Sequence, residues 1–183
     1  VFACDRMHYP WHIARAVVEN QNETVSDEEI ESLLADNPQA GNFCEKTFTD
    51  YYFTPEILRF LDNTWANAQK LSGYKKDIAL FALGYACMTK ARFGEFGRSK
   101  KGMTGRPEDE SKKDTSLGEI PLEDFRDLFV KNVRKINNLV FDSGTPCKAF
   151  CGEVREILPK LDVDLVYADP PYITEFGAND YEG

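Results

Sequence analysis

The feature that most restricts the fold is an apolar run that leads directly into a double proline. Residues 163–168 read Val-Asp-Leu-Val-Tyr-Ala, and Asp169, Pro170, Pro171 and Tyr172 follow. An apolar run of this length is typical of a buried strand in a parallel sheet. Because two consecutive prolines remove two backbone donors, the strand must end at this point. We therefore expect a buried strand whose carboxyl end carries the Asp-Pro-Pro-Tyr turn.

The remaining segments predict an α/β sheet interrupted by a helical insertion. Residues 1–4 predict a buried parallel strand that ends at Asp5, and a helix follows to about Asn20. Short strand and helix signals return at 148–150 and 153–158. Between them, helix-start signals and apolar spacing predict four helices. These are 27–35 with a capping box at Ser26, a helix opened by Thr54 and Pro55, 76–92 and 122–139.

The helical insertion is predicted to have its own apolar core. Ile57, Leu58, Leu61 and Trp65 recur at helical spacing and predict one buried face. The helix over 76–92 is strongly apolar, so we expect it to be central. Residues 43–53 are aromatic but carry no clear period, and we expect irregular structure there. Residues 94–118 predict a long loop, which in a compact protein is often functional.

Charge is unevenly distributed along the chain. The net charge of −9 over 183 residues counts against a nucleic-acid partner unless basic residues are concentrated locally. Such a concentration occurs in the predicted loop, at Arg98, Lys100, Lys101 and Arg106. These residues could contact the phosphates of DNA, and a solvated loop is the alternative interpretation.

Cysteine use and hydropathy favour a reduced, cytoplasmic compartment. The five cysteines are odd in number and scattered, and the amino-terminal residues do not resemble a signal peptide. No metal is expected, because Cys147 and Cys151 have no second pair of ligands nearby in the sequence. The longest apolar stretch, 78–88, is about half of the roughly 20 residues that a bilayer requires, so no membrane contact is expected.

The Asp-Pro-Pro-Tyr turn has a specific chemical capacity. In open α/β sheets, ligands bind at the carboxyl ends of the strands, where this turn is expected. The Pro170 carbonyl and the Asp169 carboxylate provide hydrogen-bond acceptors, and Tyr172 provides a flat face. Two acceptors and a stacking surface suit an exocyclic amino group on a heteroaromatic ring. The contribution would be orientation rather than strong base catalysis. An ordinary structural turn is the alternative.

These residues resemble the Dam-type family of DNA adenine-N6 methyltransferases, whose signature is an apolar strand ending in Asp-Pro-Pro-Tyr. A second block is also similar to one branch of that family. It comprises Asp-Tyr-Tyr-Phe-Thr-Pro-Glu at 50–56, Arg-Phe-Leu-Asp at 59–62 and Ala-Arg-Phe-Gly-Glu-Phe at 91–96. The resemblance implies a Rossmann-like sheet that binds S-adenosylmethionine. It divides the chain into catalytic residues 1–42, a target-recognition insertion over 43–140 and a return to the catalytic domain at 141–183.

The resemblance also implies roles for individual residues. Asp5 would accept hydrogen bonds from the ribose of S-adenosylmethionine, with a helix N-cap as the alternative. Glu153 falls near the adenine of the cofactor, where the family usually has Asp. Asp169 would contact both cofactor and target base. The target adenine would be held, outside the duplex, by the catalytic set Asp169, Pro170, Pro171 and Tyr172.

Some features depart from the family, and other functions stay open. The Gly-rich cofactor turn that precedes the first strand is absent, so we expect a fragment that binds the cofactor poorly. Ile57 stands where the family often has Asn. The expected partner is double-stranded DNA, with a possible cognate restriction endonuclease, and the expected state is a monomer. An RNA amino-methyltransferase and a non-catalytic DNA-binding remnant are the alternatives.

Overall fold

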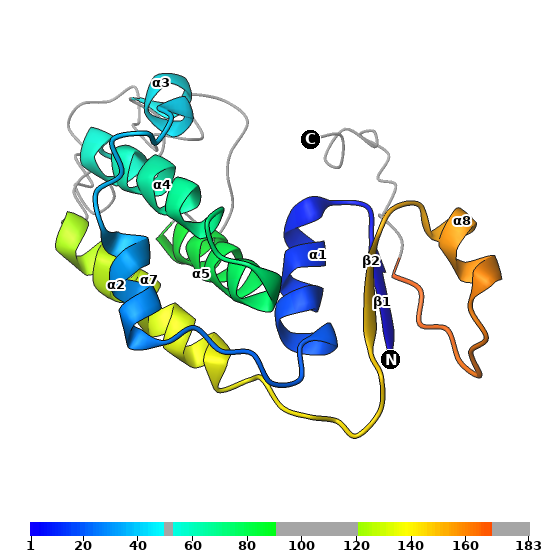
Figure 1. Ribbon diagram of the computed structural model, residues 1–183. Coiled ribbons are helices and arrows are strands. Elements are labelled where there is room, and N and C mark those ends of the chain that lie inside the picture. The colour runs from blue at the N-terminus through cyan, green and yellow to red at the C-terminus, as the bar shows by residue number, and fades with distance from the viewer. Residues whose placement is uncertain (50–52, 91–120, 170–183) are drawn as a thin grey trace, which may run out of the picture.

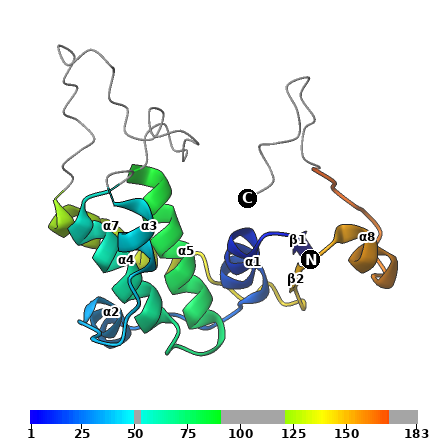
Figure 2. The ribbon, with the colours of Figure 1, turned by 90° about the horizontal axis from the view of Figure 1, so that it is seen from above.

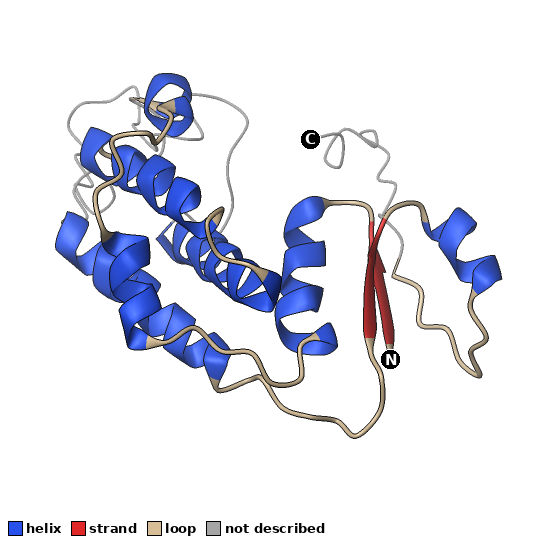
Figure 3. Cartoon of the chain, in the orientation of Figure 1, coloured by secondary structure: helices blue, strands red, loops and turns tan. Residues whose placement is uncertain are grey.

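The computed structural model describes residues 1–49, 53–90 and 121–169. Helices dominate this part of the chain, and only two strands occur in it (Figure 3). The elements, in order, are β1 (Phe2–Asp5), α1 (His8–Ala14), the π-helical turn η1 (Arg15–Glu19), α2 (Asp27–Leu34), α3 (Phe43–Phe48), α4 (Pro55–Ala68), α5 (Gly73–Lys90), α7 (Leu122–Asn137), β2 (Lys148–Cys151), α8 (Val154–Ile157) and the 3-10 helix η4 (Leu158–Lys160).

Helix α1 lies between the strands and the helical cluster. Figure 1 shows β1, β2 and α8 on one side of α1, and α2, α3, α4, α5 and α7 on the other. The perpendicular view in Figure 2 shows the same order. Helix α5 contacts α7, α1 and α4. It is therefore the centre of the cluster, as the sequence predicts.

The first strand pairs in parallel with a strand that lies about 145 residues later in the chain. Ala3 is the register partner of Ala149, and Asp5 is the partner of Cys151. The parallel strand predicted for residues 1–4 is confirmed, and its pairing with β2 was not predicted. The expected burial of β1 is wrong, because its residues alternate between exposed and half-buried and Phe2 is 47% exposed. In the described part of the chain, one neighbouring strand cannot cover both faces of β1.

The predicted strand over 163–168 is not formed in this structure. These residues have no regular secondary structure, the chain bends at Asp164, and Leu165 and Tyr167 are 87% and 89% exposed. A strand requires a neighbour for its backbone N–H and C=O groups, and an apolar run alone does not supply one. The prediction of a buried strand over 163–168 is therefore wrong in this structure, both in its secondary structure and in its burial.

Side chains from α1 and η1 occupy the outer edge of β2. The Trp11 Nε1–H donates to the Ala149 carbonyl at 3.4 Å, and a Glu19 carboxylate oxygen accepts from the Ala149 N–H at 2.8 Å. Both polar groups of Ala149 that face away from β1 are therefore satisfied by side chains. Edge strands are commonly protected by covering their unpaired backbone groups.

Two helix starts match their sequence signals. The Ser26 hydroxyl accepts from the Glu29 N–H, and the Glu29 carboxylate accepts from the Ser26 N–H, which completes a capping box at α2. The Thr54 hydroxyl accepts from the Ile57 N–H, and Pro55 occupies the first turn of α4. Both predictions are confirmed.

The core of the cluster is aromatic. Phe125 and Phe129 of α7 are fully buried, and Phe60 of α4 packs edge-on against both, with ring centroids 5.9 and 6.0 Å apart. Such arrangements contribute about 1 kcal/mol per pair beyond burial of area. Ile57 and Leu58 are also buried, as predicted.

Two helical predictions need correction. Trp65 was expected on the apolar face of α4, but it is 55% exposed, because its position lies at the edge of the face that meets α5 and α7. Residues 43–53 were expected to be irregular, yet Phe43–Phe48 forms α3. The Asp62 carboxylate accepts from the Cys44 and Glu45 N–H groups at its start, an arrangement with no local sequence signal.

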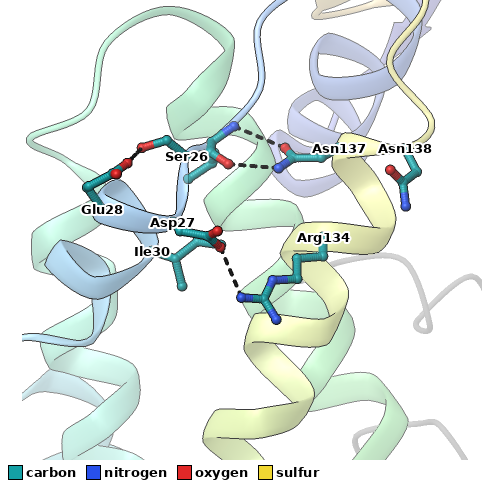
Figure 4. A pocket seen from close by; sticks show the side chains of 8 residues that line it. Ser26, Asp27, Glu28, Ile30, Arg134, Asn137 and Asn138 are labelled. Carbon is teal, nitrogen blue, oxygen red and sulfur yellow. Dashed lines mark hydrogen bonds and ion pairs between the residues drawn. The ribbon is translucent and has the colours of Figure 1, made fainter.

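Helices α2 and α7 are joined at a shallow pocket, which Figure 4 shows in detail. The Asn137 amide accepts from the Val25 N–H and donates to the Val25 carbonyl. Arg134 forms an exposed ion pair with Asp27 at 2.9 Å. Because these polar groups bind one another, they hold the start of α2 against α7. No helix within 1–49, 53–90 or 121–169 is long and apolar enough to span a bilayer.

Candidate functional site

Asp5 and Glu153 lie at the same edge of the parallel pair. Asp5 is the last residue of β1, and its register partner Cys151 is the last residue of β2, two positions before Glu153. The carboxyl ends of neighbouring parallel strands are where α/β proteins bind their ligands. The structure therefore brings together two of the three residues predicted to bind the cofactor, although 148 positions separate them in sequence.

Asp5 organises the turn into α1. Its Oδ1 accepts from the Met7 N–H at 2.7 Å, and Met7, not Asp5, is the residue that caps α1. The alternative interpretation, that Asp5 is the N-cap residue of α1, is therefore wrong. Its carboxylate instead fixes the turn that precedes the helix. Within the described residues, no hydrogen bond engages Oδ2, so one carboxylate oxygen is left for a ligand.

Gly152 connects the two strand ends. Its N–H donates to the Asp5 carbonyl at 3.0 Å, and the Cys4 thiol lies 3.6 Å from its carbonyl. Gly152 has φ of 156°, and a Cβ at this position would lie 3.3 Å from the side chain of Ile157. A glycine suits this close approach between β2 and α8.

The edge carries a local negative field. Arg6 pairs with Glu153 at 3.1 Å, but both side chains are more than half exposed, so this pair adds little stability. Burial, followed by the nearby Asp5, Cys151 and Glu153, raises the pKa of the Cys4 thiol. The thiol is thus protonated at neutral pH and does not act as a nucleophile. Carboxylates in this setting accept hydrogen bonds from hydroxyl or amino donors.

The third predicted cofactor residue, Asp169, is exposed and ends the described part of the chain. Pro170, Pro171 and Tyr172 lie outside the described residues, so their predicted roles stay predictions. The same holds for the predicted phosphate contacts at Arg98, Lys100, Lys101 and Arg106.

Sequence analysis missed a polar cluster between α1, η1 and α5. His12 Nδ1 lies 2.6 Å from Asp77 Oδ1, and Arg15 Nε lies 2.7 Å from Asp77 Oδ2. Asp77 is only 3% exposed, so both partners are needed to satisfy its carboxylate. The signal available in sequence was an acidic residue inside an apolar helix, which is rarely buried without partners.

Two cysteines near the strands, Cys147 and Cys151, each lie close to a nitrogen group. Cys151 lies 3.9 Å from His8 Nδ1, and Cys147 accepts from the amino group of Val1 at 3.6 Å. Among the described residues, no three His, Cys, Asp or Glu side chains are grouped as metal ligands.

Comparison with known proteins gives one informative similarity. The chain is 28% identical to the type II methyltransferase M2.HphI of Haemophilus parahaemolyticus. The match covers 176 residues, which is 94% of this chain and 52% of that relative, so the chain spans about half the length of the relative. No family model matches the sequence, and no solved structure matches the fold.

This similarity bears on the earlier resemblance in one respect. It supports a methyltransferase, as Asp-Pro-Pro-Tyr predicted, without distinguishing the Dam-type branch from others. The Asp5 and Glu153 carboxylates at the strand edge are hydrogen-bond acceptors. They would therefore suit the hydroxyl and amino donors of the adenosyl group of S-adenosylmethionine.

Proposed function

We propose that the chain is part of a site-specific DNA methyltransferase that transfers a methyl group from S-adenosylmethionine to the N6 amino group of adenine. The observation that carries the proposal is the placement of Asp5 and Glu153 at one edge of a parallel pair, in a chain that also contains Asp-Pro-Pro-Tyr. The similarity to a type II methyltransferase over 94% of the chain supports it.

The cofactor would be held mainly by carboxylates. Asp5 would accept from the ribose hydroxyls through Oδ2, while Oδ1 stays bound to the Met7 N–H. Glu153 would accept from the adenine amino group of the cofactor once its exposed pair with Arg6 opens. S-Adenosylmethionine supplies the electrophilic methyl group.

The target adenine would be oriented by the turn after 163–168. Asp169 and the Pro170 carbonyl would accept the two amino N–H bonds, Tyr172 would stack on the ring and Pro171 would keep the turn rigid. Held in this way, the amino nitrogen would present its lone pair to the methyl group that S-adenosylmethionine would supply. The new C–N bond would replace the C–S bond of the cofactor, whose electrons would stay on sulfur, and one amino proton would leave to solvent.

Access to the amino group requires the adenine to leave the duplex. Arg98, Lys100, Lys101 and Arg106 are proposed to contact DNA phosphates, which would offset the net charge of −9 locally. A cognate endonuclease and a monomeric, cytoplasmic enzyme are part of the same proposal.

The test compares two aspartates in the intact enzyme that contains this chain. Asp169→Ala should reduce transfer of labelled methyl groups to duplex DNA by at least about 100-fold, since it removes an orienting acceptor. Asp162→Ala, at an exposed position in the preceding segment, should leave transfer unchanged. Wild-type turnover in Asp169→Ala would exclude the assigned role.

Two further outcomes identify the alternatives. Transfer to structured RNA in preference to duplex DNA would favour an RNA amino-methyltransferase. DNA binding without S-adenosylmethionine binding by calorimetry, in the intact protein, would favour a non-catalytic remnant.

A further inference from the structure

A cavity of about 570 Å³ lies between α1, α3, α4 and α5. Its walls are mainly apolar and aromatic, and they include the exposed side chains of Phe43 and Trp65. Small-molecule sites have volumes of about 300–1,000 Å³ and apolar walls with a few polar groups. The cavity has these properties, and no step of the proposed methyl transfer uses it.

Most polar groups in the cavity wall are already engaged. The Asp62 carboxylate accepts from the N–H groups of Cys44 and Glu45, and the Tyr9 hydroxyl donates to the Phe81 carbonyl. Burial raises the pKa of the Cys44 and Cys87 thiols to about 12, so both are uncharged at neutral pH. The wall thus offers no free charge to a ligand.

Two histidines are the exceptions. His8 is exposed and, among the described residues, its Nδ1 has only a 3.9 Å contact with Cys151 Sγ, so it is not fixed in orientation, whereas His12 is. The His12 Nδ1 is fixed by Asp77, which is held on its other oxygen by Arg15. Because a carboxylate only accepts, the contact with Asp77 requires a proton on Nδ1, and in the neutral form of the ring Nε2 is then an acceptor. No hydrogen bond within the described residues engages Nε2, and His12 lines the cavity. The arrangement presents one oriented acceptor among aromatic walls.

We propose that this cavity binds a planar, uncharged heteroaromatic ring that carries an amino group, with the amino N–H donated to His12 Nε2 and the ring packed on Trp65. Apolar walls disfavour a charged ligand, aromatic walls favour a flat one, and the oriented acceptor of His12 requires a donor. An adenine ring satisfies all three conditions, either as a free nucleoside or as a base of a nucleic acid.

The first test uses the intact protein that contains this chain, with adenosine as the probe. A ring packed on Trp65 should change the tryptophan fluorescence saturably. Trp65→Phe should abolish the change. N6,N6-dimethyladenosine, which has no amino N–H, should bind about tenfold more weakly than adenosine. Absence of a saturable change, or its persistence in Trp65→Phe, would overturn the proposal.

A matched pair of variants tests His12. Asn at position 12 places an amide N–H near the Nδ1 position and keeps a donor for Asp77, but it removes the acceptor at Nε2. We expect His12→Asn to weaken adenosine binding about tenfold, and His12→Gln, whose longer amide reaches toward Nε2, to weaken it less. Equal affinity for His12→Asn and the wild type, with unchanged circular dichroism, would contradict the role of His12.

An adenine-containing single-stranded oligonucleotide distinguishes the source of the ring. Binding of both probes at Trp65 favours a base from a polynucleotide, and binding of adenosine alone favours a free nucleoside. The assay needs neither cofactor nor methyl transfer, so its failure leaves the proposed methyltransferase untouched.

Discussion

Glu19 accepts a hydrogen bond from the Ala149 backbone N–H at 2.8 Å, although 130 positions separate them in the chain. The same carboxylate accepts from Lys148 Nζ and the Tyr74 hydroxyl. Glu19 thus joins η1, α5 and β2, and through β2 it fixes the strand edge that carries Glu153. The positions of the candidate cofactor residues therefore depend on this carboxylate.

Removal of the Glu19 carboxylate should destabilise the fold. Glu19→Ala leaves the buried Ala149 N–H without an acceptor, and the expected loss in the free energy of unfolding is about 2–3 kcal/mol. Urea denaturation followed by circular dichroism measures this loss. Glu31→Ala, at an exposed position in α2, should change stability by less than about 0.5 kcal/mol. Equal effects would show that the Glu19 contacts contribute little.

The stabilisation by Glu19 should also depend on pH. Burial raises the pKa of Glu19, but hydrogen bonds from Ala149, Lys148 and Tyr74 lower it more, so the pKa lies below its ordinary value of 4.5. A lowered pKa in the folded state means that the unfolded state binds protons more readily. The stabilisation is therefore complete above about pH 4.5 and is lost as the pH falls through the lower folded pKa.

Denaturation of wild type and Glu19→Gln between pH 3 and 7 checks this sign. The stability difference between the two proteins should be largest near neutral pH and should shrink on acidification. A difference that grows as the pH falls would contradict a lowered pKa.

Gly84 should not tolerate a side chain. A Cβ at this position would lie 2.2 Å from the Tyr9 ring, which packs between α1 and α5. Gly84→Ala should therefore cost about 1–3 kcal/mol in chemical denaturation, because overpacking displaces the ring. Gly41→Ala is the control, since its Cβ would meet no atom within 4 Å. A neutral Gly84→Ala would mean that α1 moves away from α5 without cost.

Substitution by alanine should have opposite effects on stability at two serines, one before α2 and one within it. Ser26→Ala removes a capping-box acceptor and should cost about 1 kcal/mol. Ser32→Ala, inside the exposed face of α2, replaces a weaker helix former by a stronger one and should be neutral or stabilising by a few tenths. Thermal unfolding of both variants measures the contrast, and destabilisation by Ser32→Ala alone would refute it.

Local signals explain which helices could be predicted. The capping box at Ser26 and the Thr54-Pro55 start are encoded within four residues, so sequence alone locates α2 and α4. The first turn of the short helix α3 donates the Cys44 N–H to the Asp62 carboxylate, 18 positions later in the chain, and no local pattern indicates that contact. Sequence analysis did not predict α3 because a long-range hydrogen bond stabilises its start.

Strand predictions depend on partners that a local pattern cannot supply. The short strand predicted at 148–150 forms, because β1 pairs with it, whereas 163–168 was predicted buried and is exposed. At the site, the family resemblance suggested Asp5 and Glu153, but the His12–Asp77 contact joins residues 65 positions apart and has no local signal. Only the packing of α1 on α5 brings them together.

Nucleoside analysis of methylated DNA tests the central claim most directly. The intact enzyme is incubated with S-adenosylmethionine and duplex DNA, and the DNA is digested to nucleosides for mass spectrometry. The proposed function predicts N6-methyldeoxyadenosine as the product, absent from the Asp169→Ala reaction. Methylation of cytosine alone, or no transfer to DNA by a protein that binds the cofactor, would contradict it.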